Sequence, residues 1–292
     1  MKKRLAQALI GKQTKDYKKI ESLAVEIRES IIKMLLEAKS GHPAGALGMA
    51  DVFEILYFSI LKHDPKNPNW AGRDRVILSN GHICPVLYAT LAESGYFPKS
   101  ELKTFRKIGS KLQGHPHYNP KIGIENTSGP LGQGLSQAAG IATAFRINQK
   151  TNRVYCIMSD GEQQEGQNWE AFMYAGNKKL NNLTVLIDRT NIQISGYTRD
   201  VMPLKPFKQK LEAFGWNVLS IDGHNIESIA EACEQAKTTR MQPTAIICNT
   251  IPGKDVDFME NLPKWHGKPP NKKEAKLALD ELEEIEEKLE SI

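Results

Sequence analysis

Asp160 and the pair Thr190–Asn191 each follow an apolar, β-branched run, Val154 to Ile157 and Thr184 to Ile187. Such runs are typical of buried parallel strands. Each polar group is therefore expected at the carboxyl end of a strand, where open α/β sheets bind their ligands. Asp160 offers a carboxylate oxygen, and Thr190 and Asn191 offer neutral oxygens, a set that suits a magnesium ion holding a phosphate. An ordinary strand-ending Asp-Gly turn and a polar loop would leave the same pattern.

A glycine-rich segment, Thr127 to Gly134, precedes a predicted helix of small residues, Leu135 to Asn148. Glycines before a helix let backbone N–H groups approach a phosphate, and the helix dipole favours the anion. The segment is not a Walker loop, because no Lys-Ser/Thr pair follows it. It also lacks the GxGxxG pattern after a strand, so a dinucleotide site is not favoured.

The chain has seven histidines, and most of them border a glycine. His42, His82, His115 and His224 directly follow one, and His266 directly precedes one. Histidine in such a loop is poorly explained by core packing, and it is well placed to touch a ligand as a proton shuttle or hydrogen-bond donor. The alternative for any single residue is a loop histidine satisfied by the backbone.

The other uses of histidine are less favoured. No HxxxH or CxxC spacing occurs, so the sequence does not indicate a zinc site. His224, within Asp222-Gly223-His224-Asn225, is predicted to lie in a strand-end turn. His63 and His117 lack glycine-rich company and are predicted to be surface residues.

Helix-like and strand-like segments alternate along the chain, which favours an α/β fold with a doubly wound, mostly parallel sheet flanked by helices. The first predicted helix runs from about Tyr17 to Ala38. It stops at Ser40-Gly41-His42-Pro43, because glycine frees the backbone and proline restricts the residue before it. Later helices are predicted near 49–61, up to 94, and at 135–148, 169–179, 207–214 and 226–236, and strands near 74–79, 154–157, 184–187, 218–221 and 244–248.

The 292 residues are interpreted as a single domain, with a core at about 17–270 and a C-terminal amphipathic helix at about 271–291. No apolar run is long enough for a membrane span, and the N-terminus lacks the apolar segment of a signal peptide. The basic start lacks interleaved aromatic residues, so a solvated helix face or frayed tail is favoured over a nucleic-acid arm; its charged residues are Lys2, Lys3, Arg4, Lys12, Lys15, Lys18 and Lys19. The four separated cysteines are interpreted as buried thiols, which predicts a cytoplasmic protein.

Six motifs in order resemble the N-terminal, diphosphate-binding half of transketolases, a thiamine-dependent family. The resemblance covers roughly residues 17–270, and its extent is similar to a split transketolase whose halves are separate subunits. The motifs are Ser40-Gly41-His42-Pro43, the stretch from Asp74-Arg75 to Leu78-Ser79-Asn80-Gly81-His82, Gly114-His115-Pro116, Gly129 to Gly134, Ser159 to Gly166, and Trp265-His266-Gly267-Lys268-Pro269.

The resemblance implies thiamine diphosphate and Mg²⁺ or Ca²⁺ as cofactors. Asp160, the residue at position 190 and the carbonyl of Ile192 would bind the cation. His42, His115 and His266 would act on the sugar, and Glu165 would link two active sites across a subunit interface. The remaining implied cofactor contacts are His82, Gly129, Pro130, Leu131, Gly161, Glu162, Thr190, Asn191 and again His266.

Two positions depart from the family pattern. Thr190 stands where an asparagine ligand is usual, and Asn191 would reach the metal only if the loop shifted by one residue. Ala44 stands where glycine is usual after Gly-His-Pro. Threonine is a poorer ligand than an amide carbonyl, so metal affinity depends on this loop.

The implied partner is a C-terminal transketolase subunit with the pyrimidine-binding domain, in a homodimer or an α2β2 heterotetramer, and the implied substrates are sugar phosphates. The chain alone is expected to be inactive. Two alternatives stay open: another thiamine-dependent component, such as a deoxyxylulose phosphate synthase or a dehydrogenase component, and a non-catalytic scaffold or regulatory subunit with a weakened metal site. No nucleic acid or membrane partner is expected.

Overall fold

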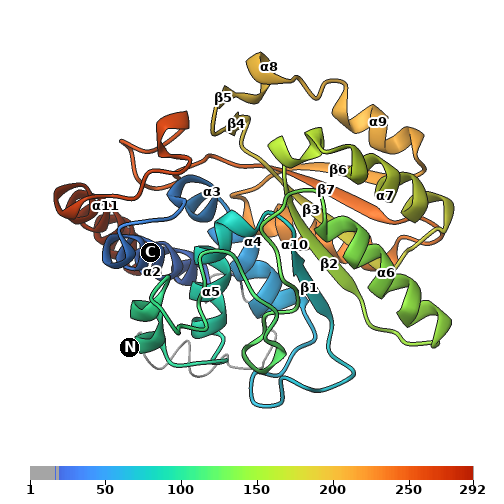
Figure 1. Ribbon diagram of the computed structural model, residues 1–292, viewed down its shortest axis with the longest axis horizontal. Helices are drawn as coiled ribbons and strands as arrows, with labels where there is room; N and C mark the ends of the chain where they lie inside the picture. The colour runs from blue at the N-terminus through green and yellow to red at the C-terminus, as the bar shows by residue number, and fades with distance from the viewer. Residues whose placement is uncertain (1–16, 18–19, 292) are drawn as a thin grey trace.

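The computed structural model describes residue 17 and residues 20–291. Within them, a five-stranded sheet has the order β1-β2-β3-β7-β6, and every neighbouring pair is parallel (Figure 1). The strands are β1 (Arg75–Leu78), β2 (Val154–Ser159), β3 (Leu183–Arg189), β6 (Asn217–Asp222) and β7 (Thr244–Asn249). The prediction of a doubly wound parallel sheet is confirmed.

Helices cover both faces of this sheet, because successive side chains of a strand point to opposite sides. On β2, Cys156 and Met158 pack into one apolar cluster, and Tyr155 and Ile157 pack into the other. The first cluster includes residues from α6 (Gly134–Ile147), α7 (Gly166–Asn177) and α9 (Phe207–Ala213). The second includes residues from α2 (Glu21–Ala38), α4 (Ala50–Ile55), α5 (Cys84–Glu93), α10 (Ile226–Thr238) and α11 (Lys272–Glu290).

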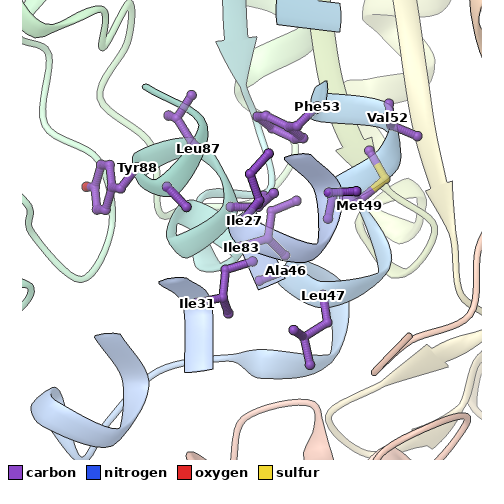
Figure 2. Packing of buried hydrophobic residues seen from close by; sticks show 14 of the residues in the cluster. Ile27, Ile31, Ala46, Leu47, Met49, Val52, Phe53, Ile83, Leu87 and Tyr88 are labelled. Carbon is purple, nitrogen blue, oxygen red and sulfur yellow. The ribbon is translucent and has the colours of Figure 1, made fainter. Parts of the chain in front are cut away.

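Within the larger cluster, residues of α2, α4 and α5 pack against one another (Figure 2). Ile27 and Ile31 of α2 are fully buried, as are Leu47 and Phe53. Burying a side chain of this size contributes about 1.5–3 kcal/mol. These helices therefore form a rigid support beneath the loop that carries His42.

The structure differs from the predicted helices at two places in this region. A short helix, α3 (Pro43–Gly48), was not predicted; it begins at Pro43, which suits a first helical position because its missing N–H needs no partner there. The predicted helix 49–61 is confirmed, but only its first part is α-helical, as α4, and it continues directly as a π-helix, η2 (Leu56–Ile60). Periodicity over one or two turns does not separate these helix types.

Short elements complete the fold. A hairpin of β4 (Ile192–Gln193) and β5 (Gly196–Tyr197) follows β3, and α8 (Thr198–Val201) follows it. 3₁₀ helices lie at Gly81–Ile83 (η3), Lys99–Thr104 (η4), Pro120–Ile122 (η5), Gly161–Gln164 (η6) and Pro263–Trp265 (η7). Thr190 lies in the short connection between the end of β3 and the start of this hairpin.

The C-terminal helix is confirmed as α11, which starts at a capping box formed by Asn271 and Glu274. All four cysteines are buried and unpaired, as the sequence predicts. No helix of the described part is long and apolar enough to cross a membrane. The basic N-terminal cluster, from Lys2 to Lys19, lies outside the described residues.

Candidate active site

Three oxygen atoms meet at the carboxyl ends of β2 and β3. The two strands are in register, with Ser159 opposite Asp188, so the residues that follow them are neighbours. The Thr190 hydroxyl lies 3.5 Å from Oδ1 of Asp160 and 3.3 Å from the carbonyl oxygen of Ile192. The side chain of Asp160 is nearly inaccessible to solvent, with 1% exposure of the residue. A carboxylate, a hydroxyl and a carbonyl in this arrangement match the hard oxygen ligands that Mg²⁺ and Ca²⁺ prefer.

The other oxygen of Asp160 is held by the chain itself. Oδ2 accepts the backbone N–H of Asn191 at 2.7 Å and lies 3.1 Å from Nη1 of Arg189. Oδ1 accepts the N–H of Gly161 at 2.8 Å. Burial raises the pKa of Asp160 above its ordinary value, and Arg189 and the backbone N–H groups of Asn191 and Gly161 partly oppose this rise. The carboxylate is therefore oriented before any cation arrives.

Asn191 does not turn its side chain toward this site. Its backbone has φ of 61°, a left-handed conformation that asparagine adopts more readily than most residues. The side chain is exposed and lines a neighbouring cavity with Arg199 and Lys205. The loop register therefore places Thr190 toward Asp160, and Asn191 contributes its N–H rather than its amide oxygen.

Glu162 is buried and ties three segments together. Its Oε1 accepts the N–H of Gly132 at 2.8 Å and also the hydroxyl of Ser79, and its Oε2 accepts the N–H of Ser159 at 3.1 Å. The Ser79 hydroxyl in turn accepts the N–H of Gly134 at 3.0 Å. Glu162 lines the cavity as expected, but its carboxylate oxygens are engaged in holding the glycine-rich loop against the ends of β1 and β2.

The glycine-rich loop requires glycine where it faces the histidines. Gly129 has φ of 153°, which L side chains rarely adopt. Gly129 and Leu131 line the cavity. Pro130 was also expected there, but it is exposed and does not line the cavity. This loop lies just before α6, where N–H groups can face a phosphate, although those of Gly132 and Gly134 already donate to Glu162 and Ser79.

Four of the glycine-flanked histidines converge. The ring of His42 lies 5.3 Å from that of His82, 5.7 Å from that of His266 and 6.4 Å from that of His115, measured between centroids. The rings of His82 and His266 are 5.2 Å apart. Nδ1 of His42 is buried and has no hydrogen-bond partner among the described residues. A buried polar atom that the chain leaves unpaired points to a ligand.

The histidines are kept neutral. Burial, together with His266, Arg106 and His115, lowers the pKa of His42 from its ordinary 6.5 to about 4. Burial also lowers the pKa of His82 far below its ordinary value, and it lowers the pKa values of His115 and His266. Neutral imidazoles can accept a proton from a substrate hydroxyl at neutral pH.

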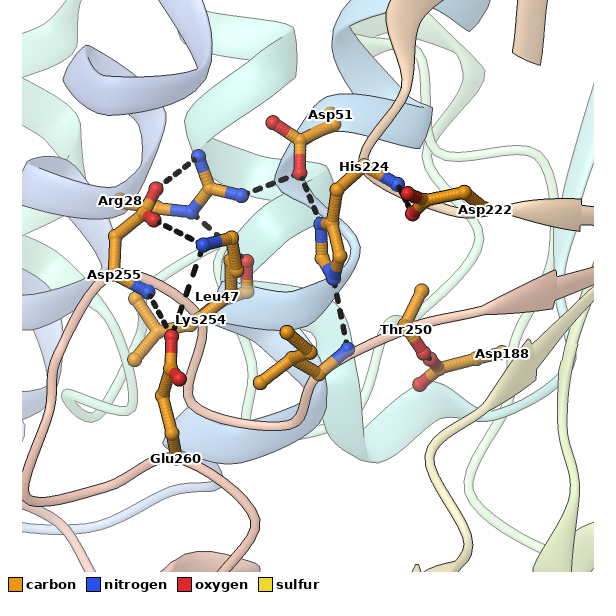
Figure 3. Close-up of polar contacts among 11 residues, drawn as sticks. Arg28, Leu47, Asp51, Asp188, Asp222, His224, Thr250, Lys254, Asp255 and Glu260 are labelled. Carbon is orange, nitrogen blue, oxygen red and sulfur yellow. Dashed lines mark hydrogen bonds and ion pairs between the residues drawn. The ribbon is translucent and has the colours of Figure 1, made fainter. Parts of the chain in front are cut away.

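The segment after β7, which brings His266 to the cluster, is anchored by a buried polar network (Figure 3). Arg28 pairs with Asp51 at 2.5 Å and with Asp255 at 2.9 Å. Nδ1 of His224 lies 2.7 Å from Asp51, and Nε2 of His224 accepts the N–H of Ile251 at 2.8 Å. These contacts fix the segment on α2 and α4.

Of the remaining histidine predictions, two are confirmed and one is wrong. His224 lies in a turn, as predicted, although its ring is largely enclosed by the network above. His117 is exposed, as predicted. The prediction of a surface position for His63 is wrong: its ring is partly buried, with Nε2 2.7 Å from the carbonyl oxygen of Tyr57 and Nδ1 3.1 Å from the Tyr96 hydroxyl. Partners from a helix end and a later turn cannot be read from its local sequence.

These groups line one cavity of about 350 Å³. It contains most of the residues expected from the sequence: His42, His82, His115, His266, Gly129, Leu131, Asp160, Gly161, Glu162, Glu165, Thr190 and Ile192. Glu165 is exposed at the start of α7, on the rim. The size of the cavity and its mixture of carboxylate, hydroxyl and imidazole groups fit a cation-bound diphosphate and a polar organic ligand.

Asp188 also lines the cavity and was missed by the sequence analysis. It accepts the hydroxyl of Thr250 at 2.5 Å, and burial and the nearby Asp160, opposed by the Thr250 hydrogen bond, raise its pKa from 3.8 to about 8. The signal was an acidic residue at the end of an otherwise apolar strand.

Comparison with known proteins agrees with this geometry. The family of transketolase thiamine diphosphate binding domains matches residues 20–285. The chain belongs to this family. It is 43% identical over 257 residues to the 6-deoxy-6-sulfo-D-fructose transketolase subunit of a Clostridium species, covering 88% of this chain and 94% of that subunit. It is 38% identical to an apulose-4-phosphate transketolase subunit of Phocaeicola vulgatus, covering 90% of this chain and 93% of that one.

Solved transketolases share the fold of this family member. The transketolase of Campylobacter jejuni superposes with a TM-score of 0.81 at 32% identity, and the match covers 93% of this chain but only 48% of that one. The chain therefore spans about half the length of that solved transketolase, and nearly the whole length of the two separate subunits. The sheet and flanking helices are those of the thiamine diphosphate-binding domain.

Proposed function

We propose that this chain is the diphosphate-binding subunit of a split transketolase, transferring a two-carbon ketol unit from a ketose phosphate to an aldose phosphate. One observation carries the proposal: four histidines whose pKa values are all lowered line the same cavity as Asp160, Thr190 and Ile192. That combination serves a cation-bound diphosphate and a polyhydroxylated substrate at the same time.

In this proposal, the Asp160 carboxylate, the Thr190 hydroxyl and the Ile192 carbonyl hold Mg²⁺ or Ca²⁺. The N–H groups of the glycine-rich loop and the ring of His82 face the cofactor phosphates. Thiamine diphosphate, when bound, supplies the carbanion chemistry of ketol transfer.

The chain's own histidines handle the substrate. His42, His115 and His266 hydrogen-bond the hydroxyl groups of the sugar, and neutral His42 accepts and returns a hydroxyl proton at its buried, unpartnered Nδ1. The burial that lowers the pKa of His42 also keeps water from competing for that atom. Glu165, on the cavity rim, is proposed to face the second active site of the assembly.

A partner chain completes the unit. Relatives that match this chain nearly end to end are named as subunits, and the chain spans about half of a solved transketolase, with 48% of it covered. We therefore infer a C-terminal subunit with the pyrimidine-binding domain, assembled as two copies of each. The four unpaired, buried thiols support a reducing compartment, the cytoplasm.

The test is reconstitution. The purified chain and a purified candidate for the pyrimidine-binding partner are assayed for ketol transfer separately and mixed, with thiamine diphosphate and Mg²⁺. Activity is expected only in the mixture and is expected to fall on His42→Ala. Full activity of the lone chain would refute the split assignment.

Two rival functions are separated by a titration of the same mixture with thiamine diphosphate, which measures cofactor binding. Thiamine diphosphate binding without ketol transfer in the mixture would favour another thiamine-dependent component. Absence of cofactor binding in the mixture would favour a scaffold.

A further inference from the structure

Arg106 joins the two loops that carry His42 and His115. Its Nη1 donates to Oγ of Ser40 at 2.5 Å, and its Nη2 donates to the carbonyl oxygen of Gly114 at 3.2 Å. Ser40 lies two residues before His42, and Gly114 directly precedes His115. One guanidinium group therefore spans both approaches to the histidine cluster.

The surroundings of Arg106 are shaped for this contact. A Cβ atom at Gly114 would lie 2.7 Å from Nε and 3.0 Å from Cζ of Arg106, so the guanidinium group lies tightly against the loop and would have to shift if residue 114 had a side chain. The backbone of Arg106 has φ of 60°, which few residues other than glycine adopt, and its N–H donates to the carbonyl oxygen of Leu112 at 2.9 Å. The guanidinium carbon also lies 5.4 Å from the centre of the Phe105 ring.

We propose that Arg106 is a positioning residue of the ketol-transfer site, whose guanidinium group sets the spacing between His42 and His115 by holding Ser40 and Gly114 at fixed distances. This inference rests on the function proposed above. A planar group with several fixed donors suits this role, because two hydrogen bonds in one plane define both distance and orientation. A lysine ammonium lacks this planar set of donors, so it would not fix the distance and orientation of the two loops in the same way.

The positive charge of Arg106 has a second effect on the same residues. It lowers the pKa values of His42 and His115, after burial in both cases. The other titratable groups around these rings are His82 and His266 in the cluster and Cys84 behind Gly114. Lys107 and His117 are exposed and line the neighbouring groove with Arg106. Arg106 thus couples the geometry of the two histidines to their protonation.

The test uses histidine titration by NMR on the full chain, and kcat/KM of the reconstituted enzyme as a function of pH. Arg106→Gln removes the positive charge and the pair of guanidinium donors to Ser40 and Gly114. The pKa values of His42 and His115 are therefore expected to rise. The acid limb of the pH profile is expected to move to higher pH, with kcat/KM falling on the order of tenfold or more. Arg106→Lys keeps the charge, so the histidine pKa values are expected to stay low while kcat/KM still falls.

Two further variants complete the design. Gly114→Ala pushes the guanidinium group off the loop and is expected to lower kcat/KM like Arg106→Lys. Lys107→Gln is the matched control, because Lys107 is exposed and pairs with the exposed Glu37; it is expected to leave both readouts unchanged.

The outcomes separate this inference from the proposed function. Unchanged His42 and His115 titrations in Arg106→Gln, or wild-type kcat/KM in Arg106→Lys, would overturn the positioning role. Because the NMR titration uses the chain alone, it can succeed or fail independently of whether ketol transfer is the reaction.

Discussion

The hydroxyl of Thr190 lies 3.5 Å from Oδ1 of Asp160, although the two residues are 30 positions apart. The parallel pairing of β2 and β3 produces this contact, because it aligns the ends of the two strands. A hydroxyl at this position is a weaker cation ligand than the amide oxygen that the family pattern calls for. The three oxygens that we propose as cation ligands therefore include one weak donor, the Thr190 hydroxyl.

The first prediction concerns Thr190. Thr190→Asn supplies an amide oxygen next to Asp160, and the affinity for Mg²⁺ in the presence of thiamine diphosphate is expected to rise on the order of tenfold. Titration calorimetry on the reconstituted enzyme measures it. Asn191→Gly is the control: glycine tolerates φ of 61° and retains the N–H to Asp160, so affinity is expected to stay the same. A large loss in the control would show that the Asn191 side chain is the ligand.

The second prediction concerns Glu162. In Glu162→Gln, an amide N–H₂ group replaces one acceptor oxygen, so a donor such as the N–H of Gly132 or Ser159 is left facing another donor. The free energy of unfolding is expected to fall by about 1–3 kcal/mol. Urea unfolding of the chain alone provides the measurement. Glu165, on the cavity rim, gives the comparison, because it is exposed and Glu165→Gln is expected to leave stability unchanged. Equal effects of the two substitutions would contradict the role of Glu162 in holding the glycine-rich loop.

The third prediction concerns Arg28. Its removal takes the Arg28 cation from the buried Asp51, which keeps only His224, and leaves Asp255 with only Lys254. Arg28→Met is therefore expected to lower the free energy of unfolding by about 3–5 kcal/mol. Lys33→Met on the same helix breaks only an exposed pair with Glu29, and is expected to cost less than about 0.5 kcal/mol. Denaturant unfolding measures both variants. A loss of stability in Arg28→Met no larger than that in Lys33→Met would show that the buried network does not stabilise the fold.

The fourth prediction is a pH dependence. The pKa of His42 is about 4 in the folded chain and near 6.5 when unfolded, so the unfolded chain binds more protons between these values. His42 therefore destabilises the fold progressively as the pH falls from 6.5 toward 4, and has no such effect above that window. The stability of wild type relative to His42→Gln is expected to decline over this range in urea unfolding experiments. Parallel curves would mean that His42 is not held neutral.

The strand pattern was sufficient to predict where Asp160 and Thr190 lie, because apolar runs in a parallel sheet end at a common edge. It could not decide whether Thr190 or Asn191 faces the cation, since that depends on the left-handed backbone of Asn191. The sequence also indicated the four histidines through their glycine neighbours.

Other contacts had no local signal. In the sequence, Glu162 is an ordinary loop carboxylate, and nothing near it indicates that it binds Ser79 and Gly132 as well as Ser159. Arg106 reaches Ser40 across 66 positions of the sequence. Such contacts arise only when distant segments pack, so the residues that bind could be predicted more readily than the residues that hold them in place.

The most direct measurement is thiamine diphosphate binding, in the presence of Mg²⁺, to the chain alone, to the isolated pyrimidine-binding partner, and to their mixture. Tight binding is expected only in the mixture, and Asp160→Asn in this chain is expected to abolish it while the chain remains folded. Undiminished binding in the Asp160→Asn mixture, or none in the wild-type mixture, would contradict the account.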